Sequence, residues 1–260
     1  MKSLKYPLLL ASALLLSLSA CGGGDLEDAL GISDPKVRFI DAVPSAPRLT
    51  FYRNDDARND ATNVTYLHAS NYAGVDTGSA RWRVREAGTA TDLDSVSVDP
   101  DRGERYTFLA LAPSSGTPPT ASLLSIRDPY GRSPLPMPQM TRLRVVNGSP
   151  NVPALDVYLT TTDIDLDRVS PTLRDMGYRE ARPRSGDDSL TMASDQYRLR
   201  LTEHGSRDVR FEADVNLPSQ GDYLLVTVPA PEGGSALRVL VVRVNSDDQA
   251  ESTIELRSSH

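Results

Sequence analysis

A segment of sixteen residues occurs twice in this chain, at a shift of 106 positions (143 minus 37), and this repeat limits the possible folds most strongly. Residues 37–52 align without gaps on residues 143–158, and most of the non-identical positions pair one apolar residue with another. The identical pairs are Arg38/Arg144, Pro44/Pro150, Pro47/Pro153, Leu49/Leu155 and Tyr52/Tyr158. Tyr72 and Tyr178 fall at the same shift. The sequence therefore predicts two copies of one structural unit.

Apolar and polar residues alternate within each copy, which is the period of a β-strand. In the segment 81–85, Trp82 and Val84 fall on one face and three arginines fall on the other. The segments 106–111 and 223–228 are apolar on both faces, as expected for central strands. Glycine-containing turns separate the segments, and no apolar helical stripe follows the first twenty residues.

This pattern predicts an all-β protein with two tandem immunoglobulin-like β-sandwich domains, and a small barrel is the alternative. We place the first β-sandwich repeat at 36–128 and the second at 141–257. The residues between them, 129–140, form a proline-rich stretch that favours an extended, semi-rigid linker. Units of this size bury enough surface to fold without disulfides, so we expect each copy to fold alone.

The amino terminus has the organisation of an export signal. Lys2 and Lys5 precede an apolar run of 13 residues, 8–20, which is shorter than the roughly 18 residues needed to span a bilayer. Such a run is typical of a secretory signal peptide, which we place at 1–20. The glycine-rich and acidic segment 21–35 that follows is expected to be a flexible tether.

The end of this signal, Leu18-Ser19-Ala20-Cys21, resembles the lipobox of bacterial lipoproteins. The resemblance implies that Cys21 becomes the lipidated amino terminus, and that Gly22 after it directs the protein to the outer membrane. A soluble secretory protein is the alternative. Cys21 is the only cysteine, so no intramolecular disulfide can form.

The repeated segment also resembles the opening of the bacterial domain of unknown function 4397. The resemblance is carried by Arg144-Val145-Val146-Asn147-Gly148-Ser149-Pro150-Asn151-Val152-Pro153-Ala154-Leu155-Asp156-Val157-Tyr158. The first copy departs from it at Val43, where the family has Ser, and at Thr50, where it has Asp. The resemblance implies an extracytoplasmic β-sandwich, often on lipoproteins, with no assigned activity.

The charge of the chain excludes one class of partner and suggests another. A formal net charge of -7 argues against nucleic-acid binding, which depends on neutralising phosphates. Arginine is nevertheless abundant, and period two places several arginines on outward strand faces, where they could bind an anionic envelope polysaccharide. This candidate anion-binding face comprises Arg38, Arg81, Arg83, Arg85, Arg144, Arg198 and Arg200. The competing expectation is that neighbouring acids neutralise these arginines in pairs.

Catalytic and metal-binding motifs are absent from the sequence, so we predict no catalytic residue, no metal and no cofactor. The histidines His68, His204 and His260 lack ligand spacing for zinc, and no Gly-x-Ser-x-Gly motif occurs. The segment 163–167 carries alternate aspartates, for which we prefer a solvated edge strand over a calcium loop, because Arg168 and Arg174 occupy the positions for Gly and Glu.

These observations predict a lipid-anchored protein of the cell envelope, at the outer membrane and facing the periplasm or the cell surface. Its expected role is non-catalytic binding or scaffolding towards an envelope protein or polysaccharide. An envelope hydrolase with a site on the loops is the alternative.

Overall fold

The computed structural model describes residues 33–44, 46–114, 120–128, 137–152, 154–160, 164–185, 189–231, 236–244 and 253–259. Cys21, the expected signal peptide and most of the expected linker lie outside these residues. The regular elements of the described residues are strands, apart from two short 3-10 helices, η1 (Asn59–Ala61) and η3 (Leu166–Arg168). The protein is therefore all-β, as the alternating pattern predicts.

The first half of the chain forms two four-stranded sheets. The outer sheet has the order β3-β2-β5-β6 and the inner sheet the order β4-β1-β7-β8. Their strands are β1 (Lys36–Ala42), β2 (Leu49–Arg53), β3 (Asp56–Ala57), β4 (Ala73–Gly74), β5 (Ala80–Glu86), β6 (Asp92–Val98), β7 (Arg105–Leu111) and β8 (Ser122–Asp128).

The second half repeats this arrangement. Its inner sheet has the order β12-β9-β16-β17-β18, with β13 also paired to β9, and its outer sheet has the order β11-β10-β14-β15. The strands are β9 (Met140–Asn147), β10 (Ala154–Thr160), β11 (Leu173–Gly177), β12 (Ala181–Arg182), β13 (Leu190–Ala193), β14 (Asp195–Glu203), β15 (Val209–Leu217), β16 (Asp222–Pro229), β17 (Leu237–Arg243) and β18 (Thr253–Arg257).

The two halves share one topology as well as one sequence segment. In the first half β1 pairs in parallel with β7, and in the second half β9 pairs in parallel with β16. The following strands, β8 and β17, add antiparallel to the same inner sheets. The repeated segment, 37–52 and 143–158, therefore builds the same strand pair in each half, one strand in each sheet of a β-sandwich.

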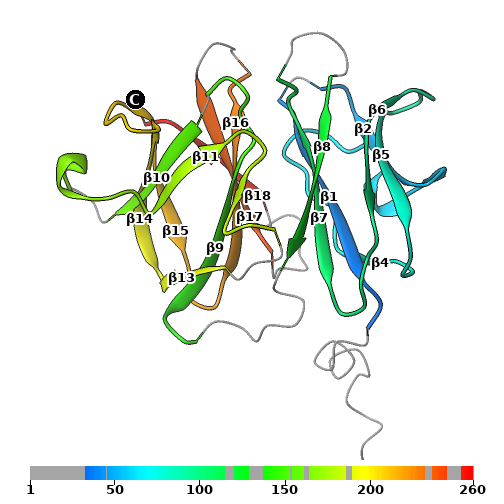
Figure 1. The fold of residues 1–260 in the computed structure, drawn as a ribbon, viewed down its shortest axis with the longest axis horizontal. Coiled ribbons are helices and arrows are strands. Elements are labelled where there is room, and N and C mark those ends of the chain that lie inside the picture. Colours follow the sequence, from blue (N-terminus) through cyan, green and yellow to red (C-terminus); the bar gives the residue numbers. More distant parts are fainter. Residues whose placement is uncertain are drawn as a thin grey trace, which may run out of the picture.

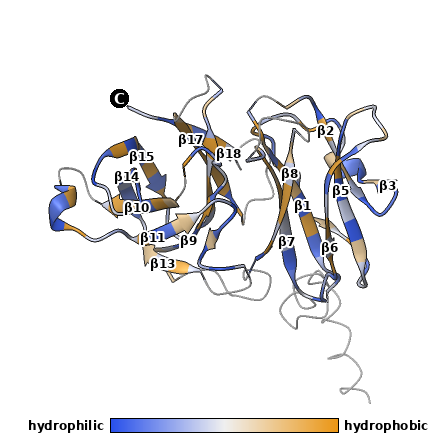
Figure 2. Cartoon of the chain, turned by 45° about the horizontal axis from the view of Figure 1, so that its top comes forward, coloured by the Kyte–Doolittle hydropathy of each residue, from blue (hydrophilic) through white to orange (hydrophobic). Residues whose placement is uncertain are grey.

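The four sheets lie side by side as four layers, with the two inner sheets facing each other (Figure 1). One apolar core fills each sandwich, around Trp82 in the first and Phe211 in the second. A third core lies between the inner sheets and combines Ile40 and Leu109 of the first half with Leu224 and Val242 of the second. Apolar residues accordingly colour the strands of both inner sheets (Figure 2). The inner strands are buried on both faces, which explains their nearly continuous apolar sequences.

The third core corrects two expectations about the arginines. Arg38 and Arg144 do alternate with the buried Phe39 and Val145, but the face on which they lie is covered by the other half of the molecule, so they are 3% and 0% exposed. Arg38 Nε donates to Thr107 Oγ1 (3.0 Å), and Arg144 Nη1 donates to the Arg127 carbonyl (3.1 Å). The prediction that both arginines point to solvent is therefore wrong. The alternation of side chains along a strand shows which face a residue lies on, but it does not show whether another part of the protein covers that face.

The acidic segment near residue 165 also differs from the expected edge strand. Leu166–Arg168 form the helix η3, and Asp165 caps it by accepting a hydrogen bond from the Asp167 amide (3.0 Å). Asp163 lies outside the described residues. Within the described part of the chain, no group of three or more His, Cys, Asp or Glu residues could hold a metal ion.

One buried position on the inner sheets has a carboxyl group in the first half and an amide in the second. Asp41 at the end of β1 corresponds to Asn147 on β9. Asn147 accepts a hydrogen bond from Thr227 and donates one to the Met176 carbonyl (2.9 Å each). Asp41 instead pairs with Ala110, which has no hydroxyl, and its Oδ2 has no partner among the described residues. Burial raises the pKa of Asp41 to about 7, against a lowering by the Val43 amide.

The third core predicts that the two halves unfold together. Leu224 is 1% exposed and packs between the inner sheets. Leu224→Ala is expected to cost about 2–5 kcal/mol through lost contacts and a cavity. Differential scanning calorimetry should show one transition that shifts to lower temperature as a whole. Two transitions, only one of which moves, would show that the halves unfold independently.

Asp41 predicts a stability difference that depends on pH. Because its folded pKa of about 7 exceeds the ordinary 3.8, wild type loses stability as pH rises from about 4 to about 7, by on the order of 4 kcal/mol. Asp41→Asn removes this titration, and Asn147 shows that the fold accepts asparagine there. The advantage of the variant over wild type, measured by urea unfolding at pH 4, 6 and 8, should grow with pH. A constant difference would contradict the assignment.

Candidate binding site

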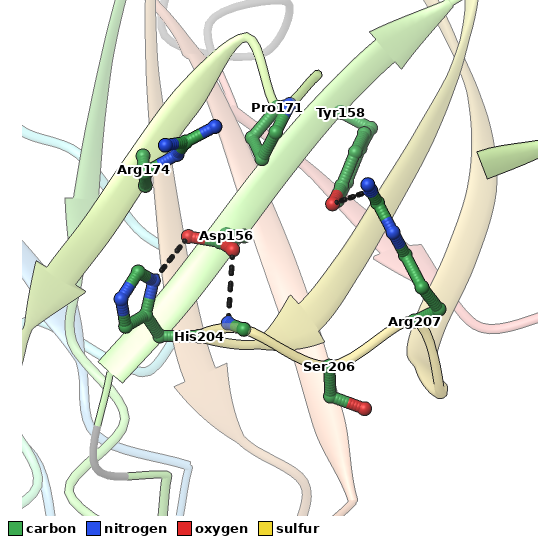
Figure 3. Close-up of a pocket in the computed structure, with 8 residues that line it drawn as sticks. Asp156, Tyr158, Pro171, Arg174, His204, Ser206 and Arg207 are labelled. Carbon is green, nitrogen blue, oxygen red and sulfur yellow. Dashed lines mark hydrogen bonds and ion pairs between the residues drawn. The ribbon is translucent and has the colours of Figure 1, made fainter. Parts of the chain in front are cut away.

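A cavity of about 170 Å³ opens on the outer sheet of the second half (Figure 3). Three segments far apart in the sequence line it: strand β10, strand β11 and the turn between β14 and β15. The side chains that matter most for its chemistry are Asp156, Tyr158, Arg174, His204, Ser206 and Arg207. They come together only in the folded protein, which is why no contiguous motif marks the site.

A bulge in β11 brings Arg174 to the cavity. Leu155 pairs with Met176 and Val157 pairs with Leu173, so Asp156 on β10 faces two residues, Arg174 and Asp175. Asp175 adopts a positive φ of 53° there. Its amide donates to Asp156 Oδ1 (2.8 Å). Such bulges redirect side chains, and this one directs the Arg174 side chain to the cavity wall.

Asp156 is the anchor of the site. Its side chain is 4% exposed, whereas the His204 side chain is 43% exposed. His204 Nδ1 lies 2.9 Å from Asp156 Oδ1 and is the donor, because an ionised carboxylate can only accept. The Gly205 amide donates to the other oxygen, Oδ2 (3.2 Å). Gly205 itself has a φ of +79°, a conformation that favours glycine.

The Asp156–His204 pair shifts the titration of both groups. The hydrogen bond to Asp156 raises the pKa of His204 above its usual value, with burial opposing the shift. Burial raises the pKa of Asp156, but the hydrogen bonds from His204 and from two backbone amides outweigh it and lower this pKa. Both charged forms are favoured, so the pair stabilises the fold at pH values where Asp156 is ionised and His204 is protonated. This stabilisation is lost at low pH, where Asp156 becomes protonated, and at pH values above the raised pKa of His204.

The opposite wall of the cavity is formed by Tyr158 and Arg207. Arg207 Nη1 donates to the Tyr158 hydroxyl and to the Val169 carbonyl (3.2 Å). The guanidinium carbon also lies 5.6 Å from the centre of the Tyr158 ring. Figure 3 shows this pair on one side of Asp156 and the His204 ring on the other.

The cavity contains a histidine, an aspartate and a serine, but they do not form a catalytic triad. Ser206 Oγ accepts a hydrogen bond from the Asp208 amide (2.9 Å), and its side chain points away from His204 (Figure 3). Among the described residues, no hydroxyl or thiol is hydrogen-bonded to His204. The arrangement orients an imidazole without a nucleophile beside it.

The first half contains the same turn without the site. Leu49 pairs with Glu86 as Leu155 pairs with Glu203, so the turn at Ala87 corresponds to that at His204. The Ala87 amide donates to the Arg48 carbonyl (2.8 Å) as the His204 amide does to Ala154 (2.9 Å). Gly88 has a φ of +81°, close to that of Gly205. The polar residues differ: Asp156, His204 and Arg207 are matched by Thr50, Ala87 and Ala90.

A second cavity, of about 320 Å³, lies in the first half beside Arg53 and Arg58. Arg53 Nη2 donates to the Asp76 carbonyl (2.8 Å), and Arg58 forms an ion pair with Asp60 (3.1 Å). Its cations therefore already face acidic residues of the same half.

The outward arginines of the predicted anion-binding face are largely paired. Arg85 lies 2.6 Å from Asp92, and Arg83 contacts Asp55 (3.0 Å). Arg198 contacts both Glu212 and Asp214. Arg81 and Arg200 donate to hydroxyls of Ser95 and Thr160. These residues lie on outer sheets, whereas Arg38 and Arg144 lie on inner sheets, so the seven arginines do not share one face.

Sequence reasoning did not identify the cavity residues as a site. The sequence shows His204 in a turn and without ligand spacing for zinc, and Asp156 within the family resemblance. One sequence feature could have identified the site: the two copies differ at its positions, with Asp156 in place of Thr50 and His204 in place of Ala87.

Residues 35–158, a little under half of the chain, match the family model described as a domain of unknown function, DUF4397. Both copies of the repeated segment fall inside the matched span, at its two ends. No curated protein matches the chain.

Solved structures with a similar β-rich fold include three bacterial proteins, each 10% identical to this chain. A carbohydrate-binding module from Eubacterium rectale in complex with maltoheptaose covers 82% of this chain and 98% of its own, with a TM-score of 0.24. A candidate cell adhesion protein from Bacteroides fragilis covers 82% and 98%, with a TM-score of 0.21. A candidate adhesin from Bacteroides ovatus covers 88% and 96%, with a TM-score of 0.21. TM-scores this low support no inference about function.

The Asp156–His204 pair predicts a measurable titration. In an NMR titration, His204 should show a midpoint above the ordinary histidine value of about 6.5. Asp156→Thr introduces the residue found at the equivalent position of the first half and should lower that midpoint, because the carboxylate partner is lost. A His204 midpoint that does not respond to Asp156→Thr would contradict the pairing.

Proposed function

We propose that this chain is a lipid-anchored protein of the bacterial cell envelope with a non-catalytic binding role, and that the cavity of the second half contacts its ligand. The ligand belongs to the envelope, as a polysaccharide or a protein. The first half supports the second through the third core. In this proposal the two halves are tandem copies of the DUF4397 domain.

The anchoring part of the proposal is based on the sequence. A positive start, a short apolar run and Cys21 fit the lipoprotein signal, and the segment 21–35 would hold the folded part away from the membrane. Acylation at Cys21 would attach the protein to the outer membrane, facing the periplasm or the cell surface. In the described part of the chain, no helix has the length and apolar character needed to cross a membrane.

The binding part rests on one observation: the second half has an open polar cavity at a turn where the first half has no counterpart of Asp156, His204 or Arg207. Changes confined to one copy of a duplicated turn are not needed for folding, because the other copy folds without them. They are explained by selection for a contact with another molecule.

A hydrolase is the second candidate, and the Asp156–His204 pair is the observation that favours it. A carboxylate that orients an imidazole is a common arrangement for general-base catalysis. The reaction would require His204 to activate water directly, because Ser206 is turned away (Figure 3). Turnover of envelope polymers by wild type, abolished in His204→Ala, would establish this alternative.

The proposed function predicts a crosslinking result in the living envelope. We expect wild type to recover an envelope component that is lost in a variant carrying Asp156→Thr and His204→Ala, the residues of the equivalent turn in the first half. Arg102→Gln, a 59% exposed position of the first half, is the control and should behave as wild type. Equal recovery by all three proteins would contradict binding at the cavity.

The same cells test the anchor. An alkyne fatty acid should label wild type and leave Cys21→Ala unlabelled and outside the membrane fraction, because the lipid attaches to that thiol. Equal labelling of both proteins would rule out lipidation at Cys21.

A further inference from the structure

The cavity of the second half presents hydrogen-bond donors without matching acceptors. Arg174 is exposed and, among the described residues, has no hydrogen-bond or ion-pair partner. Arg207 uses Nη1 for Tyr158 and Val169, and its Nε lies 3.9 Å from the exposed Asp167 carboxylate. Its Nη2 has no partner in the described part of the chain. The Tyr158 hydroxyl accepts from Arg207, and the Tyr158 side chain is buried.

His204 adds a further donor. Its Nδ1 is engaged by Asp156, so the ring is held in one orientation with Nε2 directed away from that carboxylate (Figure 3). When the imidazole is protonated, Nε2 carries a proton and donates. The charged groups acting on His204 are Asp156 from β10 and Arg174 and Asp175 from β11, and Arg207 of its own turn lines the same cavity.

The one acidic residue of the lining does not offset these donors. Asp156 is buried, and both of its oxygens are occupied by His204 and by the amides of Asp175 and Gly205. Its charge orients the site and is not presented to a ligand. The remaining charged groups, His204, Arg174 and Arg207, are cationic, on a chain whose formal net charge is -7.

Size limits what these donors can hold. The volume of about 170 Å³ is below the roughly 300–1,000 Å³ of pockets that enclose a whole small-molecule ligand. The cavity suits one substituent of a larger molecule that passes across the outer sheet. Guanidinium groups bind planar or tetrahedral oxyanions through paired hydrogen bonds, so the donors fit such a substituent.

We propose that this cavity binds the oxyanion substituent, a carboxylate or a phosphate, of an envelope saccharide, with Arg174, protonated His204 and Arg207 as the donors. This inference rests on the proposed function and names its ligand class. A neutral sugar would leave the cations of the cavity uncompensated, and a cationic one would be repelled.

The test uses calorimetric titration of the full chain with three probes. A trigalacturonic acid carries carboxylates, its methyl ester has the same length without charge, and glucose 1-phosphate carries a phosphate. We expect binding of the acid or the sugar phosphate, and at least tenfold weaker binding of the ester. Binding of the uronic acid would identify the substituent as a carboxylate, and binding of glucose 1-phosphate would identify it as a phosphate.

Two variants locate the binding. Arg174→Gln should weaken the bound anionic probe about tenfold or more, since one charge-assisted hydrogen bond is lost from an exposed residue. Arg102→Gln makes the same change of charge in the first half and should leave the affinity unchanged. Ester binding as tight as that of the anionic probe that binds, equal effects of the two substitutions, or no binding of either anion would overturn the ligand class.

The pH dependence tests the role of His204 separately. A uronate carboxyl stays ionised above roughly pH 5, so its own charge is constant in the range where histidine titrates. Affinity for the acid should be high below the His204 midpoint and fall as pH rises through it, and His204→Ala should remove this dependence. An identical pH profile in wild type and His204→Ala would remove His204 from the proposal.

These outcomes separate the two proposals. If envelope crosslinking depends on Asp156 and His204 while neither anionic probe binds, the binding function stands and the ligand class is wrong. If crosslinking is also independent of these residues, both proposals fail.

Discussion

The mutual burial of the two inner sheets is the constraint on which the rest of the molecule depends. Each sandwich has its own core. The face of each inner sheet that points away from that core is also apolar, and it would be exposed to water without the other half. Burial of apolar area stabilises by about 25 cal/mol per Å², so packing these faces together joins two small cores into one thicker structure. The same packing excludes water from Arg38 and Arg144, which therefore need partners within the protein. It also fixes the position of the second half, and with it the cavity, relative to the first.

The pairing of charges on the outer sheets explains why we propose the cavity, and not the outward arginines, as the binding site. On β5 and β14 three of the five outward arginines, Arg83, Arg85 and Arg198, form ion pairs with nearby acids, so their charges are neutralised in pairs. Arg81 and Arg200 donate to hydroxyls. At the turn after β14 the balance changes, because the one lining carboxylate is buried and saturated while Arg174 is unpaired among the described residues. Binding capacity here follows from unmatched donors and not from the number of arginines. An arginine count along the sequence cannot distinguish the two situations.

Local periodicity predicted the strands and the faces of the fold, and the repeat predicted that the two halves share a topology. Within β5, Trp82 and Val84 are buried while Arg81 is exposed, as period two requires. The third core was not predicted, because alternation assigns Arg38 and Phe39 to opposite faces without saying what covers either face. The short helix η3 was missed because Asp165 caps it through a local hydrogen bond that alternation does not encode. The cavity was missed because it depends on a bulge in β11 and on three segments that meet only after folding.

The repeated topology supplies a comparison that a single domain lacks. Both halves form the turn with the same backbone hydrogen bond and the same glycine conformation, so Thr50 and Ala87 suffice for folding. Asp156 and His204 replace them in the second half, where a buried carboxylate without its histidine and amide partners would be costly. Asp156 and His204 stabilise the second half as a pair, but Thr50 and Ala87 show that the turn itself forms without them. The difference between the halves therefore supports the proposal that the second half carries the binding site.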